Sequence, residues 1–114
     1  MSRKDKVQEA IRQEVAAIIH DELKDPRIGF ATVTRAEVTA DLRHAKIYVS
    51  VLGKQKSANS TLKALESGKG YMRTLLAKRL KMRFTPDLMF KEDKSAEYSV
   101  EFAKKLEEIK NEDK

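Results

Sequence analysis

Hydrophobic residues recur along the first part of the chain with the spacing of a helix. Between residues 3 and 24 they fall three or four positions apart, which places them in one stripe on a helical surface. The stripe consists of Val7, Ile11, Val15, Ile18, Ile19 and Leu23. Proline disfavours helical geometry in the residue before it, so we expect this helix to end before Asp25-Pro26.

The next two stretches predict a β-hairpin with one buried face. Residues 30–40 are rich in β-branched side chains, which suit a strand. Val33 falls on one face of this strand and Ala36 and Val38 fall on the other, so a bulge near Thr34–Arg35 is needed to reconcile them. Residues 45–52 alternate cleanly between apolar and polar positions. This alternation predicts that the two strands share one buried face.

Helical spacing returns from residue 62 to residue 83, and two glycines interrupt it. We expect a first helix that ends at about Ser67 and a second one from about Tyr71 to Leu80. The joint between them is Gly68-Lys69-Gly70. Short polar side chains are available to cap the first of these helices, namely Ser57, Asn59, Ser60 and Thr61.

The last part of the chain predicts a strand and a final helix. The strand lies within residues 83–93, at a sheet edge or entering the sheet after Pro86, because proline has no backbone donor for a ladder. A helix begins at Ser95 or Ala96, and residues 110–114 are expected to fray. The predicted order is α-β-β-α-α-β-α in a single α+β domain, residues 1–114.

Composition narrows the class of protein. The chain has 114 residues, of which 40% are hydrophobic and 37% charged, and its net charge is +6 with no cysteine. A small basic domain most often binds nucleic acid, and less often an anionic membrane or an acidic protein. The sequence shows neither a secretory signal nor a stretch long enough to span a bilayer, so we expect a cytoplasmic protein without a membrane partner.

The chemistry of an enzyme is not indicated. The only histidines, His20 and His44, have no partner at metal-ligand spacing, and no carboxylates are paired in a recognisable cleft. The string around Lys69 is not a phosphate loop, because Gly70 stands where that motif needs serine or threonine. We expect no catalytic residue, no metal and no cofactor.

The glycine joint carries the steepest charge asymmetry in the sequence, with seven cations against one acid between residues 62 and 83. A helix start beside glycines favours phosphate, and glycine lets a nucleic-acid backbone approach closely. Two plainer interpretations stay open: a glycine can be a helix C-cap, and the cations can form a solvated helix face. The predicted RNA-binding residues are Gly68, Lys69, Gly70, Arg73, Lys78, Arg79, Lys81 and Arg83.

Other residues are weaker candidates for the same surface. Arg3, Lys4 and Lys6 make the N-terminus basic, and Arg43 lies in the predicted hairpin turn. Tyr48 either stacks on a base or covers a neighbouring strand. With few aromatic residues in the chain, phosphate attraction is expected to dominate over stacking.

A strand, two helices around a glycine joint and another strand form the core of the KH domain, which clamps single-stranded nucleic acid. In order and spacing, nearly the whole chain resembles the ribosome-binding factor A family. The matching segments include Glu22-Leu23-Lys24-Asp25-Pro26-Arg27, the strand Ala45–Gly53 and the segment Pro86–Asp93. Gly68 stands where that family usually has alanine, so the joint is expected to be more flexible.

The resemblance implies a type II KH-like fold with a three-stranded sheet and helices packed on one face. It implies a non-catalytic assembly factor that binds the 30S ribosomal subunit and its 16S rRNA during late processing and maturation, including at low temperature. We expect a monomer when free. The alternative is an α/β interaction module whose positive charge serves an acidic protein partner.

Overall fold

The described part of the chain forms two helices and three strands. The computed structural model describes residues 2–28, 31–51 and 55–94. The elements are α1 (Arg3–Asp21), β1 (Ala31–Val38), β2 (His44–Val51), α2 (Gln55–Leu80) and β3 (Asp87–Glu92). The predicted last helix, the frayed end at 110–114 and Gly53 lie outside the described residues.

The three strands form one mixed sheet in the order β1-β2-β3. β1 and β2 are antiparallel, as the predicted hairpin requires, and β3 runs parallel to β2. The register shifts between Val33 and Arg35, which confirms the predicted bulge. Val33 therefore pairs with Val49, while Ala36 pairs with Ile47, and all four side chains are buried on one face.

β3 lies at an edge of the sheet and begins directly after Pro86, as predicted. The first backbone donor of the strand is used at once, because the Asp87 N–H donates to the Arg43 carbonyl at 2.8 Å. Proline thus ends the linker that follows α2 without leaving a ladder hydrogen bond unmade.

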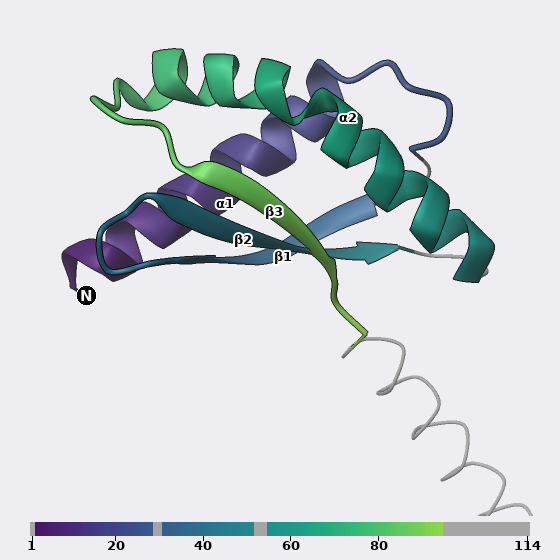
Figure 1. The fold of residues 1–114 in the computed structure, drawn as a ribbon, viewed down its shortest axis with the longest axis horizontal. Coiled ribbons are helices and arrows are strands. Elements are labelled where there is room, and N and C mark those ends of the chain that lie inside the picture. The colour runs from purple at the N-terminus through teal and green to yellow at the C-terminus, as the bar shows by residue number, and fades with distance from the viewer. Residues whose placement is uncertain (1, 29–30, 52–54, 95–114) are drawn as a thin grey trace, which may run out of the picture.

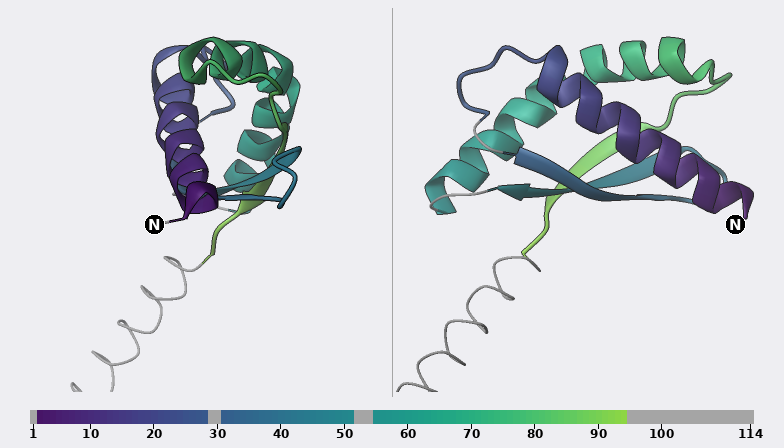
Figure 2. Two further views of the ribbon diagram at one scale, coloured as in Figure 1. Left: turned by 90° about the vertical axis from the view of Figure 1, so that its left-hand side faces the viewer. Right: turned by 180° about the vertical axis from the view of Figure 1, so that it is seen from behind.

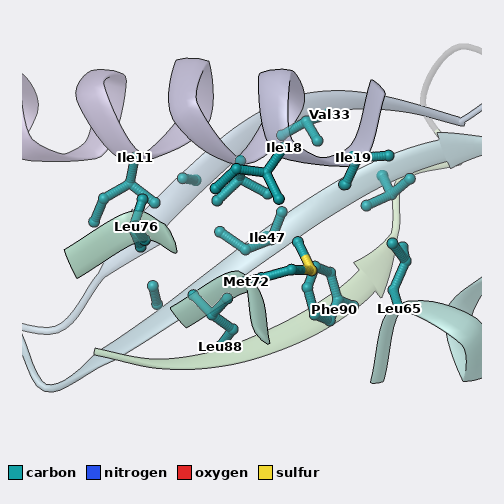
Figure 3. Close-up of a cluster of buried hydrophobic side chains, with 14 of the residues drawn as sticks. Ile11, Ile18, Ile19, Val33, Ile47, Leu65, Met72, Leu76, Leu88 and Phe90 are labelled. Atoms are coloured by element: carbon teal, nitrogen blue, oxygen red, sulfur yellow. The ribbon is translucent and has the colours of Figure 1, made fainter. Parts of the chain in front are cut away.

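Both helices cover the same face of the sheet, and no described element covers the other face (Figures 1 and 2). Their apolar stripes meet the buried faces of the strands in one core (Figure 3). Its fully buried members include Ile11, Val15 and Ile18 from α1, Leu65, Met72 and Leu76 from α2, and Ala45, Ile47 and Val49 from β2. The expected α+β arrangement with helices on one face is confirmed.

α1 begins with a capping box. The Asp5 N–H donates to Ser2 Oγ at 3.1 Å, and the Ser2 N–H donates to Asp5 Oδ2 at 3.3 Å. The helix ends at Asp21, with Glu22 as its C-cap, somewhat earlier than the proline alone requires.

The prediction of two separate helices around the glycine joint is wrong. α2 is continuous from Gln55 to Leu80, so Gly68 and Gly70 are helix-interior residues and the described order is α-β-β-α-β. Glycine in a helix costs only about 0.5–1 kcal/mol relative to alanine, and buried side chains on both sides of the glycines hold the helix against the sheet.

The helix start is also earlier than predicted. The expected caps Ser57, Asn59, Ser60 and Thr61 therefore lie inside α2. Thr61 instead is fully buried, and its hydroxyl donates to the Arg27 carbonyl at 3.2 Å. This hydrogen bond ties α2 to the turn that follows α1.

α2 nevertheless changes direction along its length, as Figure 1 shows. Two side chains on either side of the glycines donate to carbonyls one turn earlier: Ser67 Oγ to Lys63 O at 2.9 Å, and Thr74 Oγ1 to Gly70 O at 3.1 Å. Such back-bonding often bends helices. The bend therefore does not need an interruption of the helix.

Replacing Gly70 with alanine should stabilise the fold. A Cβ atom at Gly70 meets nothing within 4 Å, and one at Gly68 makes an ordinary 3.5 Å contact with Leu23 Cδ2. We expect either substitution to raise the free energy of unfolding by about 0.5–1 kcal/mol. Thermal unfolding measures the change, with Ala77→Gly in the same helix as the control of opposite sign. A lower melting temperature for Gly70→Ala would show that the bend requires glycine.

Candidate nucleic-acid interface

The predicted cations of α2 do not all point to one surface. Lys69 Nζ lies 3.0 Å from Glu66 Oε2 on the same helix. Arg79 faces α1, where NH1 lies 3.5 Å from Glu14 Oε2 and NH2 lies 3.2 Å from Glu22 Oε1. Gly68 is half-buried and faces the Leu23 side chain. These three positions are occupied by interactions within the chain.

Arg73 fastens the linker between α2 and β3. Its Nε donates to the Pro86 carbonyl at 3.1 Å and its NH2 donates to the Thr85 carbonyl at 3.0 Å. Its NH1 also lies 3.3 Å from Asp87 Oδ1. The planar guanidinium thus holds three consecutive residues, a geometry that lysine cannot reproduce.

The linker forms one wall of a groove of about 1000 Å³ at one end of the molecule. The start of α1, the turn between β1 and β2, and the end of α2 meet there, on the left in Figure 1. The lining residues are Arg3, Val7, Asp41, Leu42, Arg43, His44, Arg73, Lys81, Met82, Arg83, Phe84, Thr85 and Asp87. Three of the predicted site residues, Arg73, Lys81 and Arg83, are among them.

The groove holds five cations and two acids, and both acids are already engaged. Asp87 pairs with Arg73. Asp41 Oδ1 accepts from Thr39 Oγ1 at 2.6 Å and from the Arg43 N–H at 3.1 Å, and these hydrogen bonds lower the pKa of the Asp41 carboxyl.

The other four cations of the groove form no ion pair within residues 2–28, 31–51 and 55–94. They are Arg3, Arg43, Lys81 and Arg83. With five cations against two acids, this end of the molecule is attractive to a polyanion.

Gly70 and Lys78 lie beside this groove, next to two of its lining residues. Together with Arg73 and Thr85 they line a smaller hollow of about 440 Å³. Five of the eight predicted site residues therefore converge around the linker, while Gly68, Lys69 and Arg79 do not.

Sequence patterns give too little weight to three members of the groove. Arg3 and Arg43 are only secondary candidates there, because nothing local in the sequence shows that the helix start and the hairpin turn lie beside the end of α2. Phe84 is missed altogether, although 74% of it is exposed. An aromatic residue next to arginine in a proline-containing linker is the available signal.

On the sheet face away from the helices, Tyr48 contacts its neighbours on the strands. The Arg35 guanidinium lies over the Tyr48 ring, 4.0 Å from its centroid. The Tyr48 hydroxyl donates to Glu37 Oε2 at 3.4 Å. Tyr48 is thus half-buried among neighbouring strand residues. Of the two expectations for it, this corresponds to covering a neighbouring strand and not to stacking on a base.

Neither histidine lies in a metal-binding cluster among the described residues. His20 is exposed, with Nδ1 2.7 Å from Asp21 Oδ1, and His44 is exposed at the start of β2. In the same part of the chain, neither helix combines the length and the apolar character needed to cross a bilayer.

Two helices on one face of a mixed three-stranded sheet, with a cation-lined groove at one end, define a small basic α+β domain suited to a polyanion. The sequence pattern of the family described as ribosome-binding factor A matches residues 3–106. The ribosome-binding factor A of Desulforamulus reducens is 44% identical over 111 residues, which cover 97% of this chain and 92% of that protein. The chain belongs to the ribosome-binding factor A family.

Solved structures agree with this assignment. The crystal structure of ribosome-binding factor A from Thermus thermophilus is similar with a TM-score of 0.71 and 25% identity, over 80% of this chain and 97% of that one. A homology model of the Thermus thermophilus protein, fitted into the cryo-EM map of its complex with the 30S subunit, has a TM-score of 0.59 and 26% identity. The similarity covers 81% of this chain and 92% of that one.

Proposed function

We propose that this chain is a ribosome assembly factor that binds the small (30S) ribosomal subunit through its 16S rRNA. In this role it assists late rRNA processing and maturation, including at low temperature, without catalysing a reaction. It acts in the cytoplasm as a single domain and is a monomer when free. The observation that carries the proposal is the family match over residues 3–106.

The charge distribution supports RNA as the direct ligand. Arg3, Arg43, Lys81 and Arg83 come together in one groove, which holds five cations in all and only two acids. Phosphates supply the counter-charge that such a set of cations lacks. A second support is the similarity to a relative fitted into the map of its 30S complex.

An assembly factor must distinguish an immature subunit from a mature one. Binding shifts a conformational equilibrium only if the affinity for the two states differs. We therefore propose that the chain prefers precursor particles, in which rRNA segments are still accessible, and that it leaves when they are packed.

Cosedimentation with three probes tests the proposed function: precursor 30S particles, mature 30S subunits and deproteinised 16S rRNA. We expect the chain to pellet with all three and most strongly with the precursors. If the chain pelleted with neither precursor nor mature particles, a small-subunit function would be contradicted. Pelleting with particles but not with rRNA alone would favour the alternative, an acidic protein partner.

A further inference from the structure

The backbone is strained at two points, and both lie in the same groove. Among the described residues, Leu42 and Lys81 are the non-glycine residues with positive φ, at 60° and 51°. Both line the groove at the end of α2. Non-glycine residues in this region cost free energy and cluster at functional sites.

Packing accounts for the conformation of Leu42, whereas the end of α2 accounts for that of Lys81. Leu42 is half-buried and packs against the core from the β1–β2 turn. Lys81 is exposed and stands directly after α2, where the Met82 N–H donates to the Ala77 carbonyl at 3.3 Å. That is the 6→1 hydrogen bond typical of a Schellman motif, in which glycine is the usual residue at the position of Lys81. The lysine side chain is thus present in the groove at a conformational cost.

Phe84 adds an apolar surface to this charged groove. It is 74% exposed on the linker that Arg73 holds to α2. The Arg83 guanidinium lies 5.5 Å from the Phe84 ring centroid, so one side of the ring carries a cation. An exposed ring beside cations is the arrangement on which nucleic-acid bases stack.

We infer that this groove binds a single-stranded RNA segment, with one base stacked on Phe84. The neighbouring phosphates are neutralised by the four cations without an ion pair, Arg3, Arg43, Lys81 and Arg83. This inference rests on the proposed function and specifies where and how it is carried out. A fully paired duplex hides the faces of its bases, so the groove should distinguish unpaired from paired RNA. Neither glycine of α2 lines it, although the sequence predicts both as contacts and Gly70 lies beside it.

Fluorescence anisotropy with a short labelled single-stranded RNA of mixed sequence tests the role of Phe84. Loss of a stacked base should weaken binding by Phe84→Ala roughly 5-fold to 100-fold, whereas Phe84→Tyr should bind like the wild type. Tyr71→Ala is the matched control, because Tyr71 is also exposed and lies outside the groove. The wild type should bind a duplex of the same length more weakly than the single strand.

Lys81→Gly separates binding from folding. Glycine relieves the strain after α2, so the melting temperature should rise by a few degrees. Removing one phosphate contact should weaken RNA binding and reduce the dependence of log affinity on log salt by about 0.7. A variant that is more stable but binds less well cannot be explained by damage to the fold.

Several outcomes would overturn the inference. The first is wild-type binding to the duplex as tight as to the single strand. The second is Phe84→Ala binding RNA like the wild type, or Tyr71→Ala losing as much affinity as Phe84→Ala. The third is displacement of the RNA from the wild type by an acidic peptide. Failure of the wild type to bind the single strand would also overturn it. If wild-type chain still pelleted with 30S particles in any of these cases, the proposed function would stand and only the location or mode of binding would be wrong.

Discussion

Raising the salt concentration from about 50 mM to about 200 mM should weaken binding to small ribosomal subunits roughly 50-fold. Four groove cations, Arg3, Arg43, Lys81 and Arg83, form no ion pair in the described part of the chain. Each phosphate they neutralise on a single strand contributes about 0.7 to the slope of log affinity against log salt. Cosedimentation or anisotropy titrations at several salt concentrations measure that slope.

Charge-neutral variants locate the effect. Arg43→Gln should lower the slope by about 0.7, because it removes one cation from the groove. Lys63→Gln is the matched control: Lys63 is an exposed cation on α2 that does not line the groove. A slope that does not change in Arg43→Gln, or that falls equally in both variants, would contradict binding at this groove.

Arg73→Lys should behave almost like Arg73→Ala, although it keeps the charge. The guanidinium holds the carbonyls of Thr85 and Pro86 together with the Asp87 carboxylate, and a single ammonium cannot reach all three. We expect a loss of about 1–2 kcal/mol in the free energy of unfolding, a modest value because the side chain is 40% exposed. RNA binding should fall as well, since the linker carries Arg83 and Phe84.

The comparison distinguishes a positioning role from a phosphate contact. If Arg73 bound phosphate directly, Arg73→Lys would keep most of the affinity while Arg73→Ala would lose it. Arg79→Lys serves as the control, because Arg79 lies on the same helix but faces the carboxylates of Glu14 and Glu22. Denaturant unfolding and RNA anisotropy on the same samples give both quantities.

Local patterns were sufficient for most of the fold. The parity mismatch around Val33 and Ala36 predicted a bulge that the register confirms. Pro86 predicted an edge strand, and β3 begins at the next residue. In both places a residue's own covalent geometry or alternation decides the outcome, so no distant contact is needed to foresee it.

Two features depended on contacts that local patterns do not contain. The glycines predicted a break in α2, but packing of side chains such as Leu65 and Met72 against the sheet outweighs the small cost of glycine in a helix. The groove joins Arg3, Arg43 and Lys81, which are far apart in sequence and meet only when the elements are packed. Local sequence therefore gives the number of cations around the joint, but not the surfaces to which their side chains point.

The groove exists only in the folded chain, because a helix start, a hairpin turn and a helix end each supply part of it. Any ligand held across those three segments binds the native state and not the unfolded one. By mass action, such a ligand at a hundred times its dissociation constant stabilises the fold by about 2.7 kcal/mol. The cellular lifetime of this small domain would then depend on the supply of its ligand as well as on its own core.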